Sequence, residues 1–227
     1  MFLIKGLIGA TLQTAFIAGL ILIPAGTLEW TEANQFLFCY FILTLASTVF
    51  LAIKAPANLE ARMKMPTNET WPLSDRIATA FLGVFLVGWL VFIPIDVFHL
   101  KLLVPPQHAI SVFGGVLSLL GYGVVLTAMY QNEFATPAVT DQSDRGHELR
   151  DTGLYKLVRH PFYAGFIMFC FGMALWLQSY ASLIASFLPI TGLIGRIYAE
   201  EKILQETLPG YKEYISRTRY RIIPFVW

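Results

Sequence analysis

Charged residues are scarce in this chain of 227 residues. Asp, Glu, Lys and Arg make up 14% of it, whereas 56% of the residues are apolar and the mean hydropathy is +0.60. A soluble domain of this size rarely has so few charges to cover its surface, so the composition argues against a soluble globular protein. The formal net charge of +1 gives no reason to expect a nucleic-acid partner.

Cysteine is also scarce. Cys39 and Cys170 both lie inside apolar runs, far from each other in the sequence. Two such cysteines make neither a disulfide framework nor a zinc site, so no metal is expected. We interpret both as small buried hydrophobic residues.

Long apolar runs are what the sequence does have. Six segments approach the length that crosses a bilayer: 2–23, 35–53, 77–95, 108–130, 162–177 and 181–199. The last two are short and separated by three residues, which predicts a closing helical hairpin. Glycines within the runs are expected to let helices pack closely. The fold prediction is an all-α integral membrane protein of about six transmembrane helices, with residues 1–227 forming a single domain.

The basic residues indicate how these helices lie in the membrane. If the N-terminus is cytoplasmic, all but one of the 16 Lys and Arg residues fall on the cytoplasmic side, and the exception is Lys101. The positive-inside rule therefore predicts an inner or plasma membrane protein with both termini in the cytoplasm. The longer loops lie on this side too, so a cytoplasmic binding pocket is expected there. The basic, aromatic segment 204–221 is typical of an interfacial anchor.

One polar stretch, residues 147–165, joins a predicted cytoplasmic loop directly to an apolar helix. Pro161 suits the first position of that helix, because its missing N–H would have no partner there. Arg159 and His160 would then lie at the positive end of the helix, where electron-rich ligand groups bind. The alternative is that both side chains contact lipid headgroups.

A second polar group lies at the inner end of the last apolar run. Arg196 and Glu200 are one helical turn apart, so they share a helix face. Ionised groups at this depth need a partner or water. They either bridge each other or extend into water, or they present a carboxylate to a cationic ligand group and a guanidinium to an anionic one.

These two stretches together form a recognisable pattern. Gly-x-Tyr-x-x-x-Arg-His-Pro-x-Tyr-x-Gly at 153–165, followed by Arg-x-x-x-Glu-Glu at 196–201, resembles the isoprenylcysteine carboxyl methyltransferase family. Phospholipid N-methyltransferases share much of it. Agreement extends to 132–134, 141–146, 210–214 and 220–224, and segment 56–62 looks like bacterial members. The specific part begins at residue 132 and covers under half of the chain.

The resemblance implies S-adenosylmethionine-dependent methyl transfer by a membrane-embedded enzyme. Carried over by position, the cofactor-binding residues would be His147, Glu148, Leu149, Arg150, Tyr155, His160, Pro161, Phe162, Tyr163 and Glu200. Arg196 and Glu200 would be the catalytic residues, with Arg196 facing the acceptor. Residues 131–227 would form the cofactor-binding region, and residues 1–130 the substrate-side helices. Arg150 stands where the family often has valine, and residues 1–130 match loosely, so the acceptor stays open.

The chemistry agrees with this implication. The methyl group of S-adenosylmethionine is activated by its sulfonium, so the protein mainly has to align a nucleophile with it. The acceptor would be lipophilic: a prenylcysteine-like carboxylate, another hydrophobic small molecule or a phospholipid amine. The expected partners are this acceptor and membrane lipids, with no obligate protein partner evident.

Two other classes of protein compete with a methyltransferase. An NADPH-dependent membrane reductase of the sterol-reductase type would need extra cationic residues for the dinucleotide phosphate and more spans. A transporter or membrane scaffold would need more polar residues near the middle of its helices. The sequence favours neither.

Overall fold

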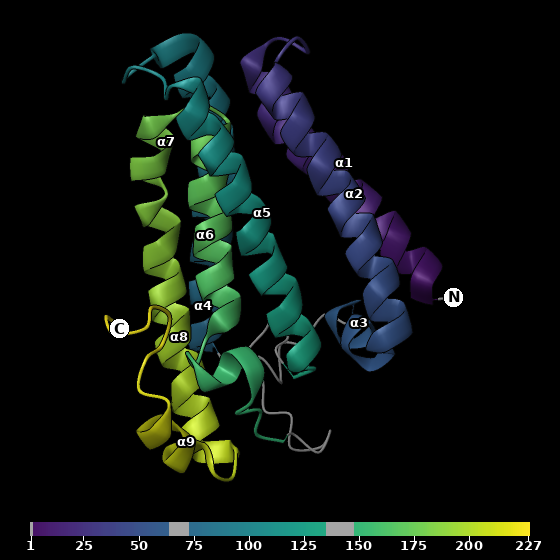
Figure 1. The fold of residues 1–227 in the computed structure, drawn as a ribbon, viewed down its shortest axis with the longest axis vertical. Coiled ribbons are helices and arrows are strands. Elements are labelled where there is room, and N and C mark those ends of the chain that lie inside the picture. Colours follow the sequence, from purple (N-terminus) through teal and green to yellow (C-terminus); the bar gives the residue numbers. More distant parts are fainter. Residues whose placement is uncertain (1, 64–72, 135–147) are drawn as a thin grey trace.

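The computed structural model describes residues 2–63, 73–134 and 148–227, and within these ranges the secondary structure is entirely helical (Figure 1). The long helices are α1 (Phe2–Ala25), α2 (Thr31–Lys54), α4 (Leu73–Ile95), α5 (His108–Gln131), α6 (Pro161–Trp176) and α8 (Phe187–Thr207). Three short helices connect or follow them: α3 (Pro56–Met63), α7 (Tyr180–Ala185) and α9 (Tyr211–Arg217). A π-helical turn η1 (Asp96–Leu100) and a 3-10 turn η3 (Gly153–Lys156) complete the described elements.

The predicted all-helical membrane fold is confirmed. Five helical segments are long and apolar enough to cross a bilayer: Phe2–Ala25, Thr31–Lys54, Asp75–Leu100, His108–Gln131 and Tyr180–Thr207. The remaining predicted span, 162–177, corresponds to α6, which has 16 residues and is shorter than the roughly 20 that a bilayer core requires. The predicted hairpin corresponds to α6 and the α7–α8 pair, whose helix is interrupted at Ser186. Its two arms pack mainly on other helices, since α6 packs on α5 and α8 packs on α4.

Local sequence explains where several of these elements begin and end. Gly26 follows α1 with a φ of +69°, a left-handed conformation that commonly ends helices. Pro94 lies in the last turn of α4, where a proline disrupts the regular hydrogen-bond pattern, and the π-helical turn η1 follows directly. Ser179 caps α7, because its side chain accepts a hydrogen bond from the Ser182 backbone N–H.

Glycines on facing sides of α5 and α6 hold these two helices in close contact. A Cβ atom at Gly121 would lie 2.5 Å from Phe169 N, and one at Gly165 would lie 2.7 Å from Gly121 O. Gly172 meets the Ser118 backbone in the same way. The prediction that glycine serves helix packing is therefore confirmed along this seam. It does not extend to every glycine in the spans, since a Cβ at Gly123 would touch nothing within 4 Å.

The connections between helices differ greatly at the two ends of the bundle. Figure 1 places α3, η3 and α9 at the end where α4 and α6 begin, and we call this the basic end. The chain turns at the opposite end through short segments, one of which contains Lys101. This arrangement gathers the predicted cytoplasmic segments at one end of the molecule. The orientation of that end in the membrane stays a prediction.

Candidate functional site

The residues just before α6 are hydrogen-bonded to the C-terminal tail. Arg159 N donates to Tyr220 O at 2.9 Å and His160 N donates to Arg221 O at 2.8 Å. Pro161 is the first residue of α6, as its ring geometry predicts. Both the Arg159 and His160 side chains are buried, with exposed fractions of 6% and 5%. The interpretation that this pair contacts lipid headgroups is therefore wrong.

Glu201 is the residue around which this junction is organised. Its Oε1 accepts hydrogen bonds from Arg159 Nε at 2.8 Å and lies 3.2 Å from His160 Nε2, while its Oε2 accepts from Arg221 Nε at 3.0 Å. Arg159 Nη1 also donates to the Thr218 carbonyl. The Glu201 carboxylate thus ties α8, the start of α6 and the tail together. Glu201 could not be assigned a role from the sequence, because its partners lie 20 to 42 residues away and no short-range pattern links them.

Glu200, the neighbouring residue, has a different environment. Its Oε2 accepts a hydrogen bond from Tyr163 OH at 2.8 Å and lies 4.0 Å from His160 Nδ1. The His160 ring stacks on the Tyr163 ring, with centroids 5.6 Å apart. The Glu200 side chain is 24% exposed, against 4% for Glu201. Among the described residues Glu200 Oε1 has no hydrogen bond, so this carboxylate is the one that can accept a cationic ligand group.

Arg196 lies on the same side of α8 but interacts with α4. Its Nε is 3.6 Å from Asp75 Oδ1, and its Nη1 donates to Thr79 Oγ1 at 3.1 Å. It also interacts electrostatically with Tyr163 and Glu200. The structure therefore brings four predicted site residues together and adds Asp75, a fully buried carboxylate. The sequence did not single out Asp75, because in isolation it is simply an acidic residue in the first turn of a helix.

The polar segment before η3 is held by its own ion pairs. Arg150 Nη2 lies 3.2 Å from Glu133 Oε1 and 3.6 Å from Glu148 Oε2. Leu149 packs against the tail beside Tyr211, which is buried. His147 lies outside the described residues.

Two tyrosines of the tail, Tyr211 and Tyr214, pack inside the protein rather than at its surface. Tyr211 and Tyr214 are buried in one cluster with Leu208, and Leu149 packs on that cluster. Tyr214 OH donates to the Tyr155 carbonyl at 2.6 Å. The prediction that this segment is an interfacial anchor is therefore wrong for Tyr211 and Tyr214, which pack inside the protein, and stays a prediction for the rest of the segment.

Tyr155 connects the carboxylate site with the rest of the basic end. Its phenol is buried and donates to the Ala128 carbonyl at 3.3 Å. Burial raises the pKa of Tyr155, the negative charge of Glu200 raises it further, and the positive charge of Arg62 opposes that rise. Arg62 from the N-terminal half of the chain and Glu200 from the C-terminal half therefore both lie close enough to this phenol to influence its pKa.

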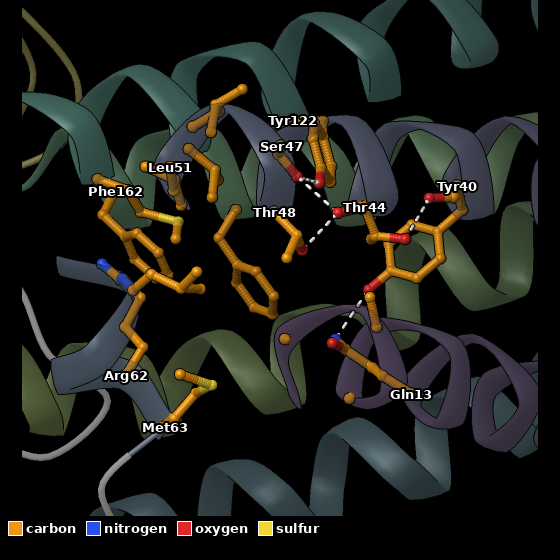
Figure 2. A pocket seen from close by; sticks show the side chains of 18 of the residues that line it. Gln13, Tyr40, Thr44, Ser47, Thr48, Leu51, Arg62, Met63, Tyr122 and Phe162 are labelled. Carbon is orange, nitrogen blue, oxygen red and sulfur yellow. Dashed lines mark hydrogen bonds between the residues drawn. The ribbon is translucent and has the colours of Figure 1, made fainter. Parts of the chain in front are cut away.

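Arg62 lines a cavity of about 560 Å³ between α1, α2, α3, α5 and α6. Figure 2 shows Arg62, Met63 and Phe162 at one end of it and Gln13 and Tyr40 at the other. Arg62 Nε donates to Asn58 Oδ1 at 2.8 Å, and the guanidinium lies 5.8 Å from the centre of the Phe162 ring. Burial lowers the pKa of Arg62 to about 10, with Tyr155 opposing the shift, so it is cationic at neutral pH.

Residues 109–209, which contain α6, α7, α8 and nearly all of α5, match the family model described as phospholipid methyltransferase. This family covers isoprenylcysteine carboxyl methyltransferase-like proteins and phospholipid methyltransferases, so the resemblance found in the sequence is confirmed. The match supports methyltransferase activity on a lipophilic or membrane substrate. No curated protein matches the chain.

Proposed function

Because residues 109–209 carry a domain of the phospholipid methyltransferase family, we propose that this protein transfers a methyl group from S-adenosylmethionine to a lipophilic acceptor in the membrane. One observation carries the proposal. Of two adjacent carboxylates on α8, Glu201 is saturated by protein donors and Glu200 is open to a ligand beside the cofactor motif.

The residues at the basic end fit S-adenosylmethionine. Its methyl group is activated by the sulfonium, so the protein has to bind it, exclude water and align the acceptor. Glu200 suits the cationic amino group, because a carboxylate at a partly buried position forms strong charge-assisted hydrogen bonds. The other residues proposed to hold the cofactor are His147, Glu148, Leu149, Arg150, Tyr155, His160, Pro161, Phe162 and Tyr163.

The cavity next to Phe162 suits the acceptor. A volume of about 560 Å³ lies within the range of sites for small organic ligands. Arg62 and Lys5 are the cationic residues among the described side chains that line it, which supports an anionic acceptor group such as a prenylcysteine-like carboxylate. Arg196 is proposed as a catalytic residue with Glu200. It is not among the residues that line this cavity, and its side chain is positioned by Asp75 and Tyr163.

Phospholipid N-methylation is the second candidate, supported by the description of the matching family. A phospholipid amine is cationic when protonated and would be repelled by Arg62 and Lys5 at the cavity. The charge of the cavity therefore favours the anionic acceptor.

The proposed location follows from the same arrangement. The apolar helices indicate an integral membrane protein, and we propose an inner or plasma membrane with both termini in the cytoplasm. The cofactor would then enter from the cytosol at the basic end, and the acceptor from the bilayer. The proposed partners are the acceptor and membrane lipids, without an obligate protein partner.

Calorimetry of the purified protein in nanodiscs tests the proposal. S-adenosylmethionine and S-adenosylhomocysteine should both bind, and NADPH should not. Binding of NADPH alone would replace the proposal with a reductase of the sterol-reductase type.

A further inference from the structure

The face of α2 that lines the cavity is polar at membrane depth. Thr44, Ser47 and Thr48 all line the cavity, whereas Ile42 and Val49 lie on the exposed side of the same helix. Polar side chains inside a membrane usually face a partner or a cavity, because lipid cannot satisfy them. The hydroxyls of Thr44 and Thr48 donate to the backbone of their own helix, which leaves their oxygen atoms as acceptors toward the cavity.

Two polar pairs line the cavity away from Arg62, one at its far end and one about midway along α2 (Figure 2). Gln13 Nε2 donates to Tyr40 OH at 2.9 Å, and Ser47 Oγ lies 2.7 Å from Tyr122 OH (Figure 2). Tyr40 and Leu51 both line the cavity and are about three helical turns apart, so the cavity extends roughly 16 Å along α2. An occupant that reaches this end is elongated.

These pairs could serve only to join helices, since side-chain hydrogen bonds between transmembrane helices commonly do so. The Gln13–Tyr40 pair joins α1 to α2, and the Ser47–Tyr122 pair joins α2 to α5. Gln13 has more hydrogen-bonding capacity than that role uses. Its amide nitrogen donates to Tyr40, and its amide oxygen, Oε1, has no partner among the described residues. An amide oxygen that faces an apolar environment without a hydrogen-bond donor is unfavourable, so an occupant that donates to it is favoured.

We propose that the acceptor carries a second polar group with an O–H donor, such as a hydroxyl, which binds the Gln13–Tyr40 pair at the far end of the cavity. The inference rests on the proposed function in one respect, that the methyl-accepting end lies near Arg62 and Phe162. A plain hydrocarbon tail would leave the Gln13 amide oxygen without a partner, and it has no donor for the hydroxyl oxygens of Thr44 and Thr48. The cavity therefore selects a hydroxylated lipophile over an unsubstituted one.

Two anionic probes of equal length distinguish these ligands: lauric acid and its ω-hydroxy derivative. Affinities are measured in nanodiscs by displacement of a fluorescent fatty acid. The wild-type protein should bind the ω-hydroxy acid about fivefold more tightly, the effect of one net hydrogen bond. Gln13→Leu and Tyr40→Phe should each abolish or reverse this preference. Tyr130→Phe is the matched control, because Tyr130 is exposed and packs on Phe50 outside the cavity.

The binding of S-adenosylhomocysteine is measured in the same variants. It should be unchanged in all of them, because the substituted residues lie on α1, α2 and α5, whereas Glu200 lies on α8. Equal affinity for the two probes in the wild-type protein, absence of binding by both, or a preference that survives Gln13→Leu would overturn the proposal. Loss of cofactor binding with the probe preference intact would instead overturn the proposed function and leave the lipid site in place.

Discussion

Arg159 Nε donates to Glu201 Oε1 at 2.8 Å, and both side chains are only 4% exposed. The pair joins the residues just before α6 to the turns of α8 at the basic end, with a separation of 42 residues in the sequence. Charges this deeply buried are stable only when they are paired and hydrogen-bonded. The integrity of the basic end therefore depends on a carboxylate that contacts no proposed ligand.

Glu201→Gln should destabilise the protein. The substitution keeps the shape of the side chain but leaves the buried Arg159 without a counter-charge, and breaking such a pair typically costs about 3–5 kcal/mol. Thermal unfolding in detergent should show a clearly lower midpoint than the wild-type protein. Glu213→Gln, an exposed position on α9, serves as the control and should leave the midpoint unchanged. Unfolding of Glu201→Gln at the wild-type midpoint would contradict the assignment.

Glu200→Gln should weaken cofactor binding with little effect on stability. Gln keeps a hydrogen-bonding group for Tyr163 but removes the charge proposed to bind the cofactor's amino group. Losing one partner of such a contact costs about 2–5 kcal/mol, hence roughly thirtyfold or more in affinity. Calorimetry with S-adenosylhomocysteine measures the loss. If Glu200→Gln and Glu201→Gln were equally unstable and both bound cofactor normally, the division of roles between them would be wrong.

Gly121→Ala should separate α5 from α6. The new Cβ would lie 2.5 Å from Phe169 N and 2.6 Å from Gly165 O, and neither backbone atom can move without moving its helix. Overpacking of this kind costs about 1–3 kcal/mol, so the unfolding midpoint should fall. Gly123→Ala on the same helix is the control, because its Cβ would meet nothing within 4 Å. Equal midpoints for the two variants would show that the seam tolerates expansion.

The sequence predicted the helices well because membrane spans follow from apolar length alone, which is a local property. The break at Ser186 was missed because both sides of it are apolar, although Pro189 carries its signal: a proline has no N–H to bond back one turn and suits the first turn of a new helix. The start of α6 at Pro161 was predicted correctly, because proline has a defined preference for the first position of a helix.

The site was only partly predictable, because the residues that form it are far apart in the sequence. Glu200 and Glu201 are adjacent and chemically identical, so no pattern could tell which one the protein saturates. The difference arises from Arg159 and Arg221, which reach Glu201 from the start of α6 and from the tail. In the same way the cavity depends on α2, α3 and α6 meeting in space, and the sequence could not connect Arg62 with Phe162.

The orientation of the bundle is open to a direct test. Fusions of a reporter enzyme after Ile53 and after Trp227 should report a cytoplasmic location, and a fusion after Thr27 should report the opposite side. The expectation follows from the concentration of basic residues at one end of the helices. A cytoplasmic result after Thr27 would show that α1 does not cross the membrane.

Arg62→Lys tests whether the cavity binds an anionic group through this residue. Burial lowers the pKa of Arg62 to about 10, and lysine starts from a lower intrinsic pKa, about 10.4 against at least 12.5 for arginine. Burial disfavours the cation of either residue type, so a lysine at this position would lose its proton at a lower pH than the native arginine does. Anion binding needs the protonated side chain. Affinity should therefore be retained at neutral pH, where the ligand carboxylate is ionised and the side chain protonated, and lost as pH rises through the pKa of the side chain, earlier in the variant.

Laurate affinity as a function of pH measures this shift. The wild-type protein should bind laurate with constant affinity up to the region of pH 10, and Arg62→Lys should weaken at a lower pH. Arg217→Lys is the control, because Arg217 is exposed and pairs with Asp151 away from the cavity. Identical pH profiles for all three proteins would mean that the anionic group does not contact Arg62. A phospholipid amine as acceptor predicts the opposite pH dependence. Its methylation should speed up as pH rises, because the amine becomes a better nucleophile and because the neighbouring positive charge is lost.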